Sequence, residues 1–191
     1  MFSERKVAQE VVYLLSKTTD RTLDRVALMK LLYLADREAI NQLGAPISGD
    51  RLVAMRLGPC LSYTLDLIEG ERASSPNGWQ SMLGNSKSDI NKVVAHSYPV
   101  PESDFSFYDE LSQAEIEILD ETWNAFGHMT QWQLVRWAHT HLPEWKDPGT
   151  SSHVISVQDI GEALGLNPEE VKEVVAALAE QDALHKMFAD A

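Results

Sequence analysis

The apolar residues of this chain recur mostly at helical spacing, and they predict a mainly α-helical protein. Over residues 4–17 they return every three or four positions, which predicts an amphipathic helix. From Thr22, the expected N-cap, to about Leu43 they cover well over half of the helical circumference, and Gly44 is suited to end that helix. A helix that is apolar on most sides belongs in the interior, so we expect this second helix to be the core helix.

The pattern changes to alternation after the core helix. Residues 52–57 alternate as in a short strand, and residues 91–98 form a second candidate strand that Pro99 ends. Gly58 and Pro59 are expected to turn the chain directly into the next helix, because proline suits the first helical turn. Two short strands on a helical body predict a small two- or three-stranded antiparallel β-sheet.

Capping signals mark two more helices in the second half of the chain. Ser112 followed by Glu115, and Thr130 followed by Gln133, have the spacing of capping boxes. In such a box the two residues each hydrogen-bond the backbone of the other at the start of a helix. Gly127 is placed to end the first of these helices.

Aromatic residues in this chain are expected to pack and not to bind a cofactor. A surface loop is predicted over residues 73–88, with Trp79 and Met82 folded back onto the body. Aromatic side chains at helical spacing usually cover a core, although a cofactor site is the alternative. Three further tryptophans come under this expectation: Trp132, Trp137 and Trp145.

The C-terminal part predicts a pair of helices. A short helix over residues 157–164 should turn at Gly165, and Asn167 and Pro168 then begin a long one. We expect a single compact helical domain over residues 1–155, with residues 156–191 as a C-terminal helical hairpin packed on it. The apolar residues of the long helix that should face inward are Val171, Val174, Val175, Leu178 and Leu184.

The spacing of this hairpin resembles a helix-turn-helix, which leaves DNA binding as an alternative to simple packing. The helix that would enter the groove carries Glu169, Glu170 and Glu173 against a single Lys172. Carboxylates in that position repel the phosphate backbone. We therefore expect a packed hairpin and no nucleic-acid partner.

Length and composition narrow the class of protein. The chain has 191 residues, 44% of them hydrophobic, which is enough for one substantial core. No apolar run approaches the roughly 18 residues that span a bilayer, and the first residues are too charged for a signal peptide. The single Cys60 has no partner for an internal disulfide and is expected to be a small buried residue. We therefore expect a cytoplasmic protein with no membrane partner.

The net charge of −13 is unevenly distributed. The first 72 residues carry ten basic and ten acidic side chains, whereas the remainder carries six and nineteen. No lysine or arginine lies between Lys92 and Arg136, and this acidic stretch includes Glu115 and Glu117, which we expect on an exposed helix face. The acidic stretch is either a solvated surface or a binding surface for a basic partner.

The sequence contains no recognised catalytic or metal-binding motif. His139 and His141 are two residues apart, so a helix points them to different sides, where they cannot hold one metal ion together. The motifs HEXXH, paired CXXC, Walker A and GXSXG do not occur. We expect a protein that is not an enzyme and that needs no cofactor.

An unusual set of polar residues interrupts the most apolar segment of the chain. On the core helix, Tyr33 shares a face with Lys30 and with Arg37, and Asp36 adjoins them. Two interpretations are open. The side chains either extend to solvent or are satisfied by ion pairs within the protein, or they form a recognition surface.

Five segments together carry a resemblance to a known family: KLLYLAD (residues 30–36), GDRLVAMRLGP (49–59), ELS (110–112), FG (126–127) and HTHLPEWKDPG (139–149). In this order and spacing, over about residues 22–160, they resemble the Panacea domain, also called the SocA-like antitoxin domain. The family often has Gly-Pro-Val where this chain has Gly58, Pro59 and Cys60, and this mild change leaves the turn intact.

The resemblance implies an antitoxin of a type II toxin–antitoxin system, which neutralises its cognate toxin by direct binding, and a basic toxin would match the acidic half. It leaves as alternatives an adaptor that delivers the toxin to a Clp-type protease, a transcriptional regulator that uses the C-terminal hairpin, or an enzyme with a scattered site. The family motifs and the acidic stretch supply the candidate toxin contacts: Lys30, Tyr33, Asp36, Arg37, Gly49, Asp50, Arg56, Gly58, Pro59, Ser62, Glu115, Glu117, Trp137, His139 and Trp145.

Overall fold

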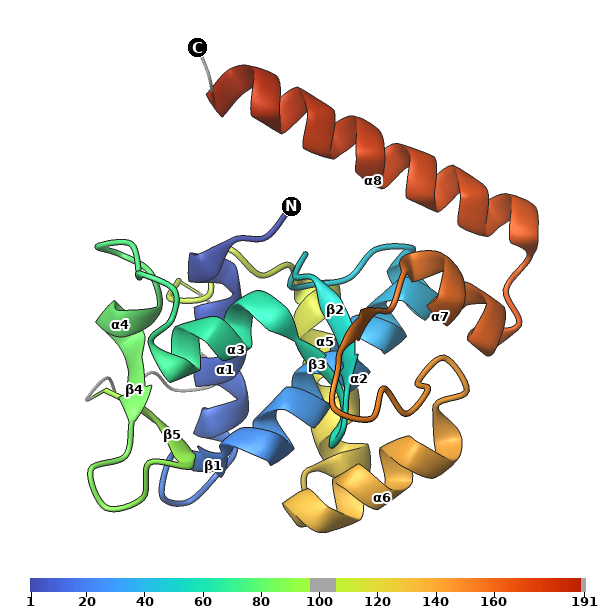
Figure 1. Cartoon of the computed structure of the whole chain (residues 1–191). Helices are drawn as coiled ribbons and strands as arrows, with labels where there is room; N and C mark the ends of the chain where they lie inside the picture. The colour runs from blue at the N-terminus through green and yellow to red at the C-terminus, as the bar shows by residue number, and fades with distance from the viewer. Residues whose placement is uncertain (97–105, 190–191) are drawn as a thin grey trace.

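Helices make up most of the fold in the computed structural model, which describes residues 1–96 and 106–189 (Figure 1). The prediction of a mainly α-helical protein is confirmed, with two small three-stranded antiparallel sheets. In chain order the elements are α1 (Glu4–Ser16), β1 (Thr22–Asp24), α2 (Arg25–Leu43), β2 (Leu52–Met55), β3 (Gly58–Leu61), α3 (Ser62–Glu69), α4 (Trp79–Met82), β4 (Leu83–Asn85), β5 (Lys92–Ala95), α5 (Gln113–Phe126), α6 (Gln131–His141), β6 (His153–Val154), α7 (Val157–Leu164) and α8 (Pro168–Ala189).

Helix α2 runs through the centre of the molecule, as its apolar pattern predicts. All of residues 27–36 are buried, and the helix packs against α1, α5, α6, α7 and strand β3. The prediction of Thr22 as N-cap is wrong because Thr22 belongs to strand β1. Asp24 is the N-cap, and its side chain accepts a hydrogen bond from Val26 N. Gly44 ends the helix in the left-handed conformation, with φ of 76°.

Both sheets join segments that lie far apart in the sequence. The first has the strand order β1-β5-β4, and Thr22 pairs with Val94. The second has the order β3-β2-β6, and Val53 pairs with Cys60 on one side and Val154 on the other. The strand predicted over residues 91–98 is confirmed as β5, while its last two residues and Pro99 lie outside the described residues.

The chain after Leu57 does not enter a helix directly, so the prediction for Gly58 and Pro59 is wrong. These residues begin strand β3, which pairs with β2 as a hairpin. Proline has no N–H for a sheet, and β3 tolerates it because it lies at the edge of its sheet. Helix α3 begins at the half-buried Ser62, whose N–H donates to Arg51 O at 2.9 Å.

Side-chain caps place the later helices as predicted. Ser112 Oγ accepts from Glu115 N at 3.3 Å, and Thr130 Oγ1 accepts from Gln133 N at 3.4 Å, so both capping boxes are present. In the loop before strand β4, Trp79 is buried against the core as expected, in the short helix α4.

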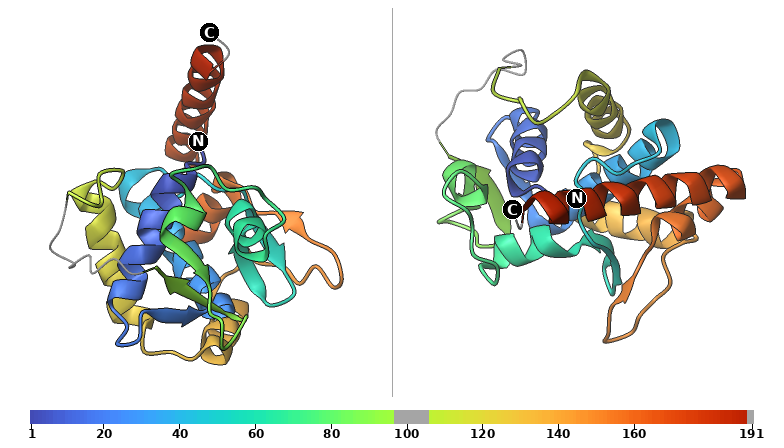
Figure 2. Two further views of the ribbon diagram at one scale, coloured as in Figure 1. Left: turned by 90° about the vertical axis from the view of Figure 1, so that its left-hand side faces the viewer. Right: turned by 90° about the horizontal axis from the view of Figure 1, so that it is seen from above.

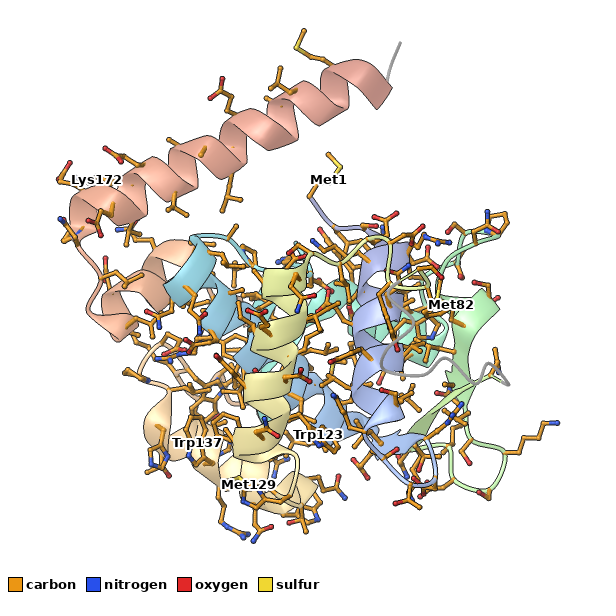
Figure 3. All side chains as sticks on the ribbon, turned by 180° about the vertical axis from the view of Figure 1, so that it is seen from behind. Met1, Met82, Trp123, Met129, Trp137 and Lys172 are labelled. Carbon is orange, nitrogen blue, oxygen red and sulfur yellow. The ribbon has the colours of Figure 1, made fainter. Side chains whose placement is uncertain are left out.

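The two C-terminal helices form a pair, but α8 rests on the body only near its start. Val171 is buried against Gly161 of α7, where an added Cβ would come within 2.6 Å of Val171 Cγ2. The expectation that Val175 and Leu184 face inward is wrong, because both are exposed. Figures 2 and 3 show the rest of α8 standing clear of the body. Within the described residues, no helix has the length and apolar character needed to cross a membrane.

A variant that ends at Val175 is therefore expected to keep nearly all of its stability. It loses the part of α8 that stands clear of the body, so the free energy of unfolding should fall by less than about 1 kcal/mol. Urea unfolding followed by circular dichroism measures this change. Val171→Asp is the matched comparison, because it places a charge at the buried contact with Gly161 and should destabilise α7 and α8. A loss of several kcal/mol on truncation would contradict the arrangement of α8.

Candidate partner-binding site

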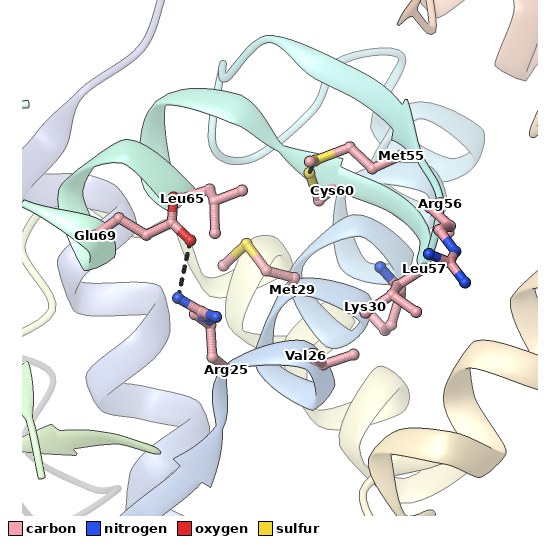
Figure 4. Close-up of a pocket in the computed structure, with 11 residues that line it drawn as sticks. Arg25, Val26, Met29, Lys30, Met55, Arg56, Leu57, Cys60, Leu65 and Glu69 are labelled. Carbon is pink, nitrogen blue, oxygen red and sulfur yellow. Dashed lines mark hydrogen bonds and ion pairs between the residues drawn. The ribbon is translucent and has the colours of Figure 1, made fainter. Parts of the chain in front are cut away.

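A pocket of about 190 Å³ lies where the β2–β3 hairpin meets the first half of α2 and helix α3 (Figure 4). Three of the predicted candidates, Lys30, Arg56 and Gly58, meet there. The lining is Arg25, Val26, Met29 and Lys30 from α2, Met55, Arg56, Leu57, Gly58 and Cys60 from the hairpin, and Leu65 and Glu69 from α3. Most of this wall is apolar, so the pocket favours a hydrophobic group.

Lys30 supplies a buried positive charge to this pocket. Only 3% of the residue is exposed, and its Nζ donates a hydrogen bond to Pro59 O at 2.7 Å. Burial lowers the pKa of the Lys30 ammonium to about 8. Beside it, burial raises the pKa of the Cys60 thiol to about 11, so Cys60 is a neutral part of the wall.

The hairpin turn lies directly on α2 and α6 because position 58 is a glycine. Gly58 has φ of 101°, a conformation that L-amino acids rarely adopt. A Cβ on Gly58 would also lie 2.9 Å from Lys30 Cε and 3.6 Å from Ala138 Cβ. Gly58 and Pro59 are therefore needed for the approach of the hairpin to Lys30, and not for a helix start.

Exposed apolar side chains border the pocket. Met55 is 36% exposed and Leu57 is 39% exposed, and Arg56 between them is exposed as well. On the opposite side, Arg25 and Glu69 form an ion pair at 2.8 Å. A recess with a hydrophobic border and charged groups at its edge has the properties of a protein-binding surface.

The last turns of α6 and the segment after it contact the hairpin. Trp145 Nε1 donates to Met55 O at 2.9 Å, and the Trp145 ring stacks on His139 with centroids 4.0 Å apart. His139 is hydrogen-bonded to the backbone of Arg56. Burial, and then the nearby Lys30, lower the pKa of the His139 imidazole. Two of the predicted contact residues, His139 and Trp145, thus position the hairpin.

The other tryptophans of this region lie away from the pocket. Trp137 packs on Phe126 and stacks on His141, with ring centroids 4.7 Å apart in both pairs. The expectation that Trp132 covers the core is wrong, because 52% of it is exposed. Its position at the start of α6, after the cap at Thr130, directs it to solvent.

Tyr33 and Arg37 both bind a buried carboxylate that the sequence patterns did not single out. Glu144 Oε1 accepts from Tyr33 Oη at 3.0 Å and from Arg37 Nε at 2.8 Å. The Glu144 side chain is fully buried. Of the two interpretations of these polar residues, the internal ion pair is therefore correct for Arg37. Glu144 lies between Pro143 and Trp145 in one of the family segments, and this position was the signal from which the sequence could have indicated it.

Asp36 and Asp50 are linked by hydrogen bonds in the segment that leads into the hairpin, and Gly49 precedes Asp50 there. Asp36 is buried and accepts from Ser48 N at 2.9 Å and from Ser48 Oγ, which in turn accepts from Asp50 N. Asp50 also accepts from Thr64 N at 2.9 Å and so caps helix α3. At Gly49, a Cβ would meet the backbone of Met1 at 2.5 Å. These hydrogen bonds connect α2 with the segment before β2 and with α3.

Glu10 of α1 is a second buried carboxylate that the sequence patterns missed. It is fully buried, and neither of its side-chain oxygens has a hydrogen-bond partner among the described residues. Burial, and then the neighbouring Asp36, raise the pKa of Glu10 well above its ordinary value. In residues 1–96 and 106–189, no group of histidine, cysteine and carboxylate side chains has the arrangement of a metal site.

Helix α1 and its C-cap residue Lys17 pair with some carboxylates of the acidic stretch. Lys6 pairs with Glu115 at 2.6 Å, and Lys17 pairs with Asp120 at 2.7 Å. The expectation that Glu115 is exposed is wrong, since only 14% of its side chain is accessible, whereas Glu117 is exposed. Residues 102–105 of the acidic stretch lie outside the described residues. The carboxylates of α5 are thus partly used to hold α1.

The chain belongs to the family described as "Antitoxin SocA-like, Panacea domain", whose model matches residues 28–146. The match includes α2 from Leu28 onward, the β2–β3 hairpin and the segment of Glu144, and these supply most of the pocket and its support. Comparison with curated proteins and with solved structures finds no match. Membership of this family indicates an antitoxin role, and it implies a toxin as the partner in general.

Proposed function

We propose that this protein is the antitoxin of a type II toxin–antitoxin system and that it neutralises its toxin by direct binding at the β2–β3 hairpin. The carrying observation is that exposed Met55 and Leu57 adjoin an apolar pocket within the family segment. Buried pockets next to exposed hydrophobic residues are where interfaces concentrate their binding energy. The proposal includes that the protein acts in the cytoplasm and that it works by binding and not by catalysis.

The hairpin is a better primary contact than the acidic stretch. Glu115 and Asp120 are already paired with lysines of α1, so a partner would have to compete for them. The net charge of −13 still favours the approach of a basic toxin over a longer range. We therefore propose that the exposed acidic residues, such as Glu117, attract the toxin from a distance, and that the hairpin supplies most of the binding affinity.

The test is co-expression with the protein encoded by the neighbouring gene, which this proposal expects to be toxic. We expect the wild-type chain to relieve growth arrest, and Leu57→Asp to weaken toxin binding at least about 10-fold because it places a charge in the apolar border. Isothermal titration calorimetry measures the affinity. Leu43→Asp is the control, because Leu43 is 46% exposed at the other end of α2. Failure of the wild type to relieve arrest refutes the function, and equal binding by both variants refutes the surface.

An adaptor for a Clp-type protease is the second candidate, and the projecting helix α8 favours it. Exposed Val175, Leu184 and Met187 lie on a helix that is free of the body beyond its start, and such a helix is available for a second partner. The half-life of the toxin distinguishes the two functions. Neutralisation by binding leaves the half-life of the toxin unchanged, whereas delivery to a protease shortens it. If delivery depends on α8, a chain that ends at Val175 should return the half-life to its value without the protein.

A further inference from the structure

Lys30 is a buried cation that no carboxylate of the described residues pairs with. Its Nζ donates to one acceptor, Pro59 O, and the ionisable side chains close enough to interact with it are the Cys60 thiol and the His139 imidazole. An ammonium has three N–H donors, so two remain unused. Arg37, two turns further along α2, contrasts with it because it has the buried Glu144 as its partner.

The position of Lys30 makes its free donors available to a ligand. Lys30 is one of the residues that line the pocket, and its side chain lies between α2 and the hairpin (Figure 4). Buried charges are stable when they are paired and hydrogen-bonded. A carboxylate at Nζ would provide both the pairing and the acceptors that the described residues do not supply.

The rest of the wall selects an apolar group of limited size. Met29, Cys60 and Leu65 face the same space, and methionine adapts its shape to a bound group. The pocket of about 190 Å³ is somewhat larger than the cavity of about 150 Å³ known to hold benzene, and smaller than pockets for drug-sized ligands. It therefore has room for one hydrophobic side chain.

We propose that this pocket binds the C-terminal residue of a polypeptide, with the terminal carboxylate on Lys30 Nζ and an apolar side chain against Met29 and Leu65. A terminal residue carries both groups on one Cα, so both fit in a single small recess. An internal acidic residue with an apolar neighbour would have to place two side chains there. The inference rests on the proposed function only for the identity of the polypeptide, which would be the toxin.

Fluorescent hexapeptides of sequence Gly-Ser-Gly-Ser-Ala-Leu, with either a free carboxylate or a carboxamide end, test this proposal by fluorescence anisotropy. We expect the free acid to bind the full-length protein about 10-fold or more tightly than the amide, because it adds a charged hydrogen bond. Lys30→Met should abolish this preference while it keeps the apolar stem. The same pair of peptides is measured with phenylalanine in place of the terminal leucine. The proposal is overturned if the acid and the amide bind equally, or if neither binds, for both terminal residues.

Two further variants keep the result interpretable. Leu65→Trp fills the pocket without altering the ammonium and should weaken binding of both peptides, which tests the site if Lys30→Met does not fold. Lys172→Met is the matched control, because Lys172 is exposed at the start of α8 and should change nothing. Relief of growth arrest without a preference for the acid refutes this inference alone, and a preference without relief refutes the proposed function alone.

Discussion

Replacing Glu144 by alanine is expected to lower the free energy of unfolding by about 3–5 kcal/mol, because it leaves buried partners without their acceptor. Tyr33 Oη and Arg37 Nε both donate to Glu144 Oε1, and 17% of the Arg37 side chain is exposed, so water cannot fully replace the carboxylate. For a domain of this size the melting temperature should fall by on the order of 10 °C.

Urea unfolding followed by circular dichroism measures this loss. Glu117→Ala is the control, since Glu117 is an exposed carboxylate on α5 and its removal should change stability by no more than about 0.5 kcal/mol. In a double-mutant cycle with Arg37→Met, the two losses should not add, because both remove the same ion pair. Additive losses would show that Glu144 and Arg37 act independently, contrary to the structure.

The contribution of Asp36 to stability is expected to fall as the pH rises from about 4 to 6, because this buried carboxylate holds its proton more tightly in the folded state than in the unfolded chain. Burial raises the pKa of Asp36 from 3.8 to about 6, against the effect of hydrogen bonds from Ser48. Between these values the unfolded chain releases a proton that the folded chain keeps, which costs the folded state about 3 kcal/mol by pH 7. The raised pKa of Glu10 adds a cost of the same sign above pH 4.5.

Glu10→Met is therefore expected to stabilise the protein, and by more at pH 8 than at pH 4.5. Methionine fills a similar volume and has no charge or polar atom that needs a partner, whereas neither side-chain oxygen of Glu10 has a hydrogen-bond partner among residues 1–96 and 106–189. Thermal unfolding at pH 4.5, 6 and 8 measures the gain, which should shrink as the pH falls and the unfolded Glu10 becomes protonated.

Glu4→Gln is the control of opposite sign. Burial acts to raise the pKa of Glu4, but hydrogen bonds from Ser74, Ser75 and Trp79 outweigh it, and the pKa is lowered. Its contribution is present above the ordinary pKa of 4.5 and is lost as the pH falls through the lower folded value, so this variant should be destabilised most at high pH. Destabilisation of Glu10→Met at pH 8 would contradict the assignment of Glu10 as a buried, protonated acid.

Local signals in the sequence predicted the helices well. The capping boxes at Ser112 and Thr130, the left-handed Gly44 and the all-round apolar pattern of α2 each depend on residues close in the chain, and each is confirmed. The error at Gly58 and Pro59 has a different origin. The same two residues suit a helix start and an edge strand, and the pairing of β3 with β2 decides between them.

The candidate site could be predicted only in part. The family segments contain Lys30, Gly58 and Trp145, which meet at or behind the pocket. Glu10 and Glu144 were missed because a carboxylate in a sequence gives no sign of burial, and their neighbours lie on other elements. Likewise, the pairing of Glu115 with Lys6 joins residues on α5 and α1 that are 109 positions apart.

The sequence alone determined the helical class, the capping boxes at Ser112 and Thr130 and the family, because these depend on periodicity, on residues within one turn of each other, and on ordered motifs. The tertiary structure alone decided which polar residues face inward, that Lys30 pairs with no carboxylate among the described residues, and where the apolar pocket lies. Those features arise when α2, the hairpin and α3 come together, since burial and charge pairing depend on neighbours in space and not on neighbours in the chain.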